Sequence, residues 1–122
     1  MKRVLVVDDE PFIRQVIGDV LQDEGYDALF ASSGHAMLKL LETEHPDLVL
    51  LDLMMPDGDG QEALQAMQSQ PHLADIPVVV VSTGVARQRL DGVTVRFLAK
   101  PFDLDKLLQI VIDTIGPALA PE

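Results

Sequence analysis

The chain has 122 residues and a formal net charge of −11, from 9 lysine and arginine residues against 20 aspartate and glutamate residues. This charge would repel a nucleic-acid backbone, and an aromatic content of 4% offers no platform for stacked bases, so we expect no direct nucleic-acid binding. With 48% hydrophobic residues and no cysteine, the composition is that of a folded globular domain without a disulfide scaffold, thiol catalysis or a thiolate metal site.

The first part of the chain alternates apolar and amphipathic segments. Residues 4–7 form a valine-rich run that is too short for a signal peptide, and no apolar stretch approaches a membrane span, so we expect a soluble, cytoplasmic protein. Residues 13–21 carry apolar side chains at helical spacing, with Pro11 suited to the first turn and Gly25 after the end. A less apolar strand follows at residues 28–31, and we expect it nearer a sheet edge.

The remaining elements continue this alternation. In chain order they are a weaker helix at 37–41, a strand at 48–51, a weaker helix at 63–67, a strand at 78–81, one or two helical turns at 85–90, a strand at 97–99 and a helix at 104–115. Apart from 28–31, the strand segments are continuous apolar runs, which predicts that both of their faces are covered.

Five repeats of strand and helix predict an α/β fold, with a parallel sheet, right-handed crossovers and helices on both faces. We expect one domain over residues 1–122, with a core at about 2–116. Residues 117–122 would form a tail or the start of a linker.

The candidate chemistry lies at the carboxyl ends of the predicted strands, because an open parallel sheet binds its ligands there. One at a time, the residues at these ends are ordinary loop-entry and helix-capping residues. Together they bring three carboxylates, hydroxyl groups and an ammonium group to one edge. They are Asp8 and Asp9 after the first strand, Asp52 after the third, Ser82 and Thr83 after the fourth, and Lys100 after the fifth.

The carboxylates predict a cation site. If the first and third strands are adjacent, their ends lie about 4.8 Å apart, so Asp8, Asp9 and Asp52 would crowd like charges into a small volume. Oxygen ligands with incomplete protein coordination suit Mg²⁺, which keeps several waters and shares its shell with a phosphate. No zinc site is expected, because the histidines are scattered along the chain at His35, His45 and His72.

Four motifs at these strand ends resemble those of a response-regulator receiver domain, the phosphoacceptor half of a two-component signalling system. They are VLVVDDE at 4–10, PDLVLLDLMMPDGDG at 46–60, PVVVVST at 77–83 and FLAKPF at 97–102. The resemblance covers essentially the whole chain. It implies the flavodoxin-like three-layer sandwich, with five parallel strands in the order 2-1-3-4-5.

The resemblance also implies a role for each site residue. Asp52 would be the phosphoacceptor. Mg²⁺ would be held by Asp8, Asp9, Asp52 and the backbone carbonyl of Met54. Lys100, which precedes a cis proline in the family, would contact the phosphoryl group.

Two further positions match the family's switch residues. Ser82 matches the switch hydroxyl, with Thr83 as a rival in a position that a small residue usually occupies. Phe97 matches the switch aromatic, although a plain strand residue packed against a helix is nearly as good an interpretation of the sequence.

The chain departs from the family in two places. Between Ser82 and Lys100 it is about one helical turn shorter than expected, which predicts a short or poorly ordered helix at 85–90 and a partner contact unlike the common dimer. Met54 and Gly84, each two residues beyond a site residue, offer no side-chain group to orient a hydrolytic water, so we expect slow dephosphorylation.

The implied partners are a sensor histidine kinase or histidine phosphotransfer protein and an unidentified downstream protein, with the chain a monomer or a weak phosphorylation-dependent dimer. No enzyme activity is implied beyond its own phosphoryl transfer and dephosphorylation. A pseudo-receiver, which keeps the fold as an interaction module without using phosphorylation, remains an alternative.

Other classes with an aspartate or a phosphate at this sheet edge fit less well. A haloacid-dehalogenase-like phosphatase needs an acidic residue where Met54 stands. In a flavin mononucleotide carrier, Asp8 and Asp9 would repel the phosphate that the first loop must cradle. A nicotinamide-binding domain would show a glycine fingerprint after the first strand, and none occurs.

Overall fold

The computed structural model describes residues 2–53, 55, 59–83 and 95–118. Its elements in chain order are β1 (Arg3–Val7), α1 (Pro11–Asp23), β2 (Asp27–Ala31), α2 (Gly34–Thr43), β3 (Leu48–Leu51), α3 (Asp59–Gln68), β4 (Val78–Thr83), β5 (Arg96–Lys100) and α4 (Leu104–Ile115). The strands form one parallel sheet in the order β2-β1-β3-β4-β5. This arrangement confirms the predicted flavodoxin-like fold.

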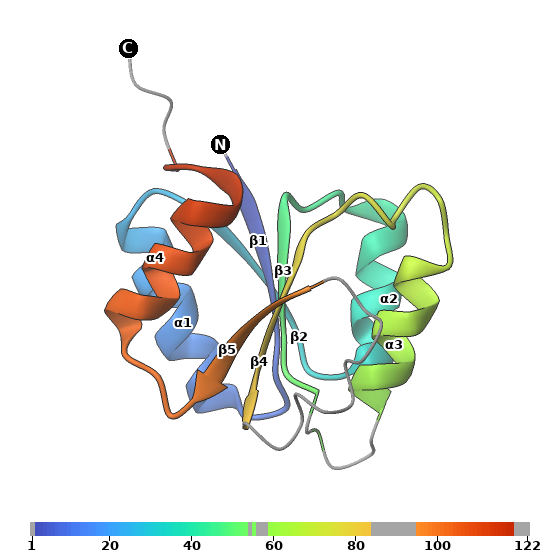
Figure 1. Cartoon of the computed structure of the whole chain (residues 1–122), viewed down its shortest axis with the longest axis horizontal. Coiled ribbons are helices and arrows are strands. Elements are labelled where there is room, and N and C mark those ends of the chain that lie inside the picture. Colours follow the sequence, from blue (N-terminus) through green and yellow to red (C-terminus); the bar gives the residue numbers. More distant parts are fainter. Residues whose placement is uncertain (1, 54, 56–58, 84–94, 119–122) are drawn as a thin grey trace.

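Helices cover both faces of the sheet, α1 and α4 on one side and α2 and α3 on the other (Figure 1). Alternate residues of β1 are buried on opposite faces of the sheet. Val4 and Val6 belong to the core under α1 and α4, while Leu5 and Val7 belong to the core under α2 and α3. All four are at most 1% exposed. Burying an aliphatic side chain of this size contributes about 1.5–3 kcal/mol, so the central strands anchor both layers.

The two edges of the sheet differ from its centre. The expected edge position of the second strand is confirmed for β2. The expectation of full coverage was wrong for the fifth strand: β5 is the opposite edge, and its residues are partly or largely exposed. The reason is that an apolar run reports a preference for burial, whereas the strand order decides how much cover a strand receives.

Local signals explain where the helices begin and end. Pro11 occupies the first turn of α1, where its missing N–H has no helical partner to lose. After α1, Gly25 adopts a φ of 96°, a left-handed conformation that glycine reaches without a steric penalty. The Ser33 side chain accepts a hydrogen bond of 3.0 Å from the Ala36 backbone and caps the start of α2.

Several sequence expectations fall outside the described residues. They are the short helix at 85–90, the water-orienting positions Met54 and Gly84, the Met54 carbonyl as a metal ligand, and most of the tail, at 119–122. Within the described ranges, none of the helices is long and apolar enough to cross a membrane.

Candidate functional site

The strand ends converge because neighbouring strands stop at the same level. Val7 of β1 is in register with Leu51 of β3, and the Asp52 backbone N–H donates to the Val7 carbonyl at 3.0 Å. The carboxylates of Asp8, Asp9 and Asp52 follow directly, each offering an oxygen within 4.8 Å of the others. The predicted juxtaposition of these three carboxylates is therefore present at this edge.

Two of the three carboxylates are buried. Asp8 is 3% exposed and Asp52 is 5% exposed. An ionised carboxylate at such a site needs a positive partner or hydrogen-bond donors, because the protein interior replaces the lost water poorly. The Glu10 backbone N–H provides one donor, at 2.9 Å from Asp8 Oδ1.

Lys100 supplies the positive charge. Its Nζ atom lies 3.3 Å from Asp8 Oδ2 and 3.3 Å from Asp52 Oδ2. Burial lowers the pKa of Lys100, but attraction by Asp52 and Asp8 outweighs burial, so this pKa lies above its ordinary value of 10.5. The ammonium group is consequently charged at neutral pH. The Lys100–Pro101 peptide is cis, as the family resemblance implied.

The two hydroxyl candidates are not equivalent. Ser82 is fully buried, and its Oγ donates to Asp52 Oδ1 at 3.3 Å. The side chain of Thr83 lies outside the described part of the structure. Ser82 is thus the hydroxyl that the structure brings to Asp52.

Phe97 lies farther from the carboxylates along β5. It is in register with Val80, and its partly buried side chain packs against the core under α2 and α3. This packing agrees with the plain structural interpretation and leaves the switch role a prediction.

Gly60 is a site residue that the sequence analysis does not single out. In the structure, a Cβ atom built on Gly60 would lie 2.7 Å from the backbone oxygen of Asp52 and 3.0 Å from Leu53 Cα. Only a glycine lets α3 approach the Asp52 backbone this closely, and a glycine at a helix start does not by itself signal such a contact.

The donor set fits a magnesium ion. Three carboxylates supply hard oxygen ligands. Three ligands do not fill the coordination shell of Mg²⁺, so positions stay open for water and phosphate. Among the described residues, His35, His45 and His72 do not belong to this group, and all three are exposed.

Comparison with known proteins places the chain in a family. The sequence model of the response regulator receiver domain matches residues 4–112. Regulatory protein AtoC of Escherichia coli is 36% identical over 117 residues, which cover 91% of this chain and 24% of AtoC. The chain spans less than half the length of AtoC and of several other curated relatives.

Solved structures agree with this assignment. The response regulator TrrA from Thermotoga maritima, in complex with Mg²⁺ and BeF, is 33% identical with a TM-score of 0.84, and the match covers 93% of this chain and 99% of TrrA. The receiver domain of sensor histidine kinase PA1611 from Pseudomonas aeruginosa, with a magnesium ion in its active-site cleft, is 26% identical with a TM-score of 0.85 over 94% of this chain and 98% of that domain. The chain therefore belongs to the response regulator receiver domain family of two-component signalling.

Proposed function

We propose that this chain works as a magnesium-dependent phosphoacceptor, with Asp52 as the residue that takes the phosphoryl group. The observation that carries this proposal is the surroundings of the Asp52 carboxylate. It is 5% exposed, contacts both Ser82 Oγ and Lys100 Nζ, and lies in the cluster with Asp8 and Asp9. A hydroxyl donor, a positive charge and two further carboxylates thus surround the oxygen pair that would act as the nucleophile.

The proposed reaction is a single phosphoryl transfer. A carboxylate oxygen of Asp52 attacks the phosphorus of a phosphohistidine, the P–N bond breaks, and its electron pair leaves with the imidazole. The product is an acyl phosphate on Asp52. With a small donor such as acetyl phosphate, the P–O bond breaks instead and acetate leaves.

The surrounding residues would stabilise charge on the transferring group. In this proposal, the Lys100 ammonium contacts a phosphoryl oxygen, and Ser82 Oγ donates a hydrogen bond to another. Asp8, Asp9, Asp52 and the Met54 carbonyl would hold Mg²⁺, which when bound supplies further neutralisation of phosphoryl charge.

The signal would leave the domain through a change in protein contacts. In this proposal, Ser82 moves toward the phosphoryl group, Phe97 follows it inward, and the surface around residues 85–90 changes. The input partner would be a sensor histidine kinase or a histidine phosphotransfer protein, and the output partner another protein. The chain would be a monomer or a weak phosphorylation-dependent dimer.

The remaining expectations complete the proposal. Residues 1–122 would form one receiver domain, located in the cytoplasm, with a tail or the start of a linker after residue 116. It would catalyse only its own phosphorylation and dephosphorylation. Its net charge of −11 argues against a direct contact with nucleic acid.

Incubation with acetyl phosphate, with and without Mg²⁺, followed by intact-mass measurement, tests the proposal. We expect a gain of one phosphoryl group that requires Mg²⁺ and is absent from Asp52→Asn. Asp19→Asn, which alters an exposed aspartate on α1, is the matched control and should gain the group normally. No gain with acetyl phosphate and none with a phosphorylated histidine kinase would contradict the proposal and favour a pseudo-receiver.

A further inference from the structure

Arg14 forms a contact with the acidic loop that the proposed chemistry does not use. The residue lies in the first turns of α1, and its Nη1 donates a 2.6 Å hydrogen bond to the backbone carbonyl oxygen of Asp8. The donor is a charged guanidinium group, so this bond is stronger than one between neutral groups. Arg14 thus ties α1 to the peptide between the two loop aspartates.

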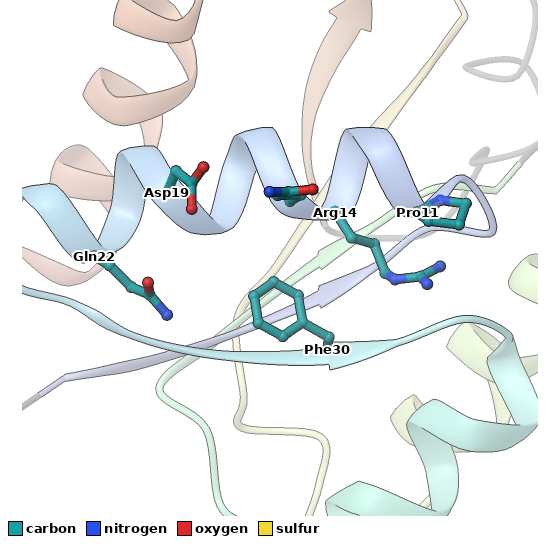
Figure 2. A pocket seen from close by; sticks show the side chains of 6 residues that line it. Pro11, Arg14, Asp19, Gln22 and Phe30 are labelled. Atoms are coloured by element: carbon teal, nitrogen blue, oxygen red, sulfur yellow. The ribbon is translucent and has the colours of Figure 1, made fainter.

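The side chain reaches this carbonyl along the groove between α1 and β2. Figure 2 shows Arg14 on the same side of α1 as Phe30, with Pro11, Asp19 and Gln22 along the same groove. The Phe30 ring packs on α1 at Gly18, where an added Cβ atom would lie 2.5 Å from the ring. The close approach of Phe30 keeps β2 against the helix that carries Arg14.

The tied peptide matters because the two aspartates are held differently. Asp8 is held at every polar atom: its N–H donates to Ala31, its carboxylate accepts from Glu10 and Lys100, and its carbonyl accepts from Arg14. For the carboxylate of Asp9, no hydrogen bond is recorded among the described residues. The direction in which the Asp9 side chain leaves the backbone depends on how the peptide that precedes it is held.

We propose that Arg14 is a positioning residue for the magnesium site: its bond to the Asp8 carbonyl orients the Asp8–Asp9 peptide, so that the Asp9 carboxylate faces Asp8 and Asp52. This inference rests on the proposed magnesium-dependent function. It assigns Arg14 no contact with the ion or the phosphoryl group.

The direction in which the Mg²⁺ affinity changes when Arg14 is replaced distinguishes a positioning role from a simple electrostatic effect. Arg14 is a cation close to a cation site, so removing its charge should by Coulomb's law strengthen Mg²⁺ binding. Loss of positioning should weaken it instead. Partners of metal ligands typically contribute about 10- to 100-fold to metal affinity, so we expect Arg14→Met to bind Mg²⁺ about tenfold more weakly than the wild type.

The experiment measures the Mg²⁺ dissociation constant of the full chain by calorimetry, together with the ¹⁵N–¹H spectrum of the metal-free protein. The Asp9 amide belongs to the same peptide as the Asp8 carbonyl, so its resonance should shift in Arg14→Met before any metal is added. Gln15→Met is the matched control because Gln15 lines the same groove. Arg14→Lys keeps the charge without the guanidinium geometry and should recover part of the affinity, remaining about threefold weaker than the wild type.

Urea unfolding identifies any variant that does not fold. If Arg14→Met fails this check, Arg14→Lys decides the question in its place. A folded Arg14 variant with wild-type affinity and an unshifted Asp9 amide would overturn the inference. Tighter binding in Arg14→Met would also overturn it, in favour of electrostatics alone. If the wild type itself binds no Mg²⁺, the proposed function fails and the inference fails with it.

Discussion

The Nζ atom of Lys100 lies 3.3 Å from Asp52 Oδ2, although β4 lies between β5, which ends at Lys100, and β3, which Asp52 directly follows. Neighbouring strands are about 4.8 Å apart, so the two strand ends lie about two such spacings apart. A long, unbranched side chain can cross this distance over the end of β4. Both the length and the charge of the Lys100 side chain therefore contribute to the site.

Replacing Lys100 should slow phosphoryl transfer and leave Mg²⁺ binding in place. We expect Lys100→Met to slow phosphorylation by acetyl phosphate about 100-fold, because a preorganised charge at the transferring group is lost. Mg²⁺ binding should persist, since the three carboxylates remain. Rates from intact-mass time courses, with Lys106→Met on the exposed face of α4 as control, would measure this. A Lys100→Met rate within threefold of the wild type would contradict the assigned role.

Magnesium should stabilise the folded protein, because unfolding separates Asp8, Asp9 and Asp52. At a free concentration of 100 times the dissociation constant, a ligand that binds only the folded state adds about 2.7 kcal/mol to the free energy of unfolding. We expect the urea midpoint to rise with Mg²⁺ and to fall back when a chelator removes it. Asp9→Asn should lose this response and Asp19→Asn should keep it. Equal midpoints with and without Mg²⁺ would argue against the metal site.

Gly60→Ala should damage both the fold and the site. The added Cβ would meet the Asp52 backbone oxygen at 2.7 Å, and backbone atoms cannot turn away as a flexible side chain can. Overpacking costs about 1–3 kcal/mol, against a helix-propensity gain of at most about 1 kcal/mol for alanine. We expect a lower urea midpoint and slower phosphorylation. Gln65→Ala, at an exposed position of the same helix, should change neither. If Gly60→Ala proved as stable as the wild type, the close approach of α3 would not constrain the site.

Tyr26 links stability to pH at the opposite end of the sheet from the site. Its hydroxyl donates a 2.6 Å hydrogen bond to the Gly116 carbonyl after α4, and the residue is 3% exposed. Burial, and then the nearby charge of Glu24, raise the pKa of Tyr26 above its ordinary value of 10.0. A group whose pKa is higher in the folded state contributes stability below its unfolded pKa and loses it as the pH rises through the folded value.

Tyr26→Phe tests this link. The variant should cost about 1 kcal/mol at pH 8, the usual contribution of one hydrogen bond. It should also lose less stability than the wild type between pH 10 and 11, which urea unfolding at each pH would measure. Because Tyr26 is the only tyrosine, an ultraviolet absorbance titration reports its ionisation directly. Parallel losses of stability in both proteins, or a titration midpoint at or below 10, would refute the assignment.

Much of the site was predictable because its signals are local. Residues 4–7 and 48–51 are apolar runs that end in aspartate, and a parallel sheet brings the ends of such runs to one edge. The positions of Asp8, Asp9 and Asp52 followed from that rule together with adjacency of the first and third strands. The family resemblance supplied the strand order, which the structure confirms.

Other features depended on contacts between residues that no local pattern connects. The sequence by itself determined the alternation of strands and helices, and which residues end each strand, because burial periodicity and turn chemistry act over a few residues. Only the tertiary structure decided how far the residues of β5 are exposed, that Gly60 packs on the Asp52 backbone, and that Arg14 binds the Asp8 carbonyl. These contacts arise from strand order, from the depth at which a helix packs on the sheet, and from the direction of individual side chains. All three are properties of the assembled fold, in which each element is placed by its neighbours and not by its own residues.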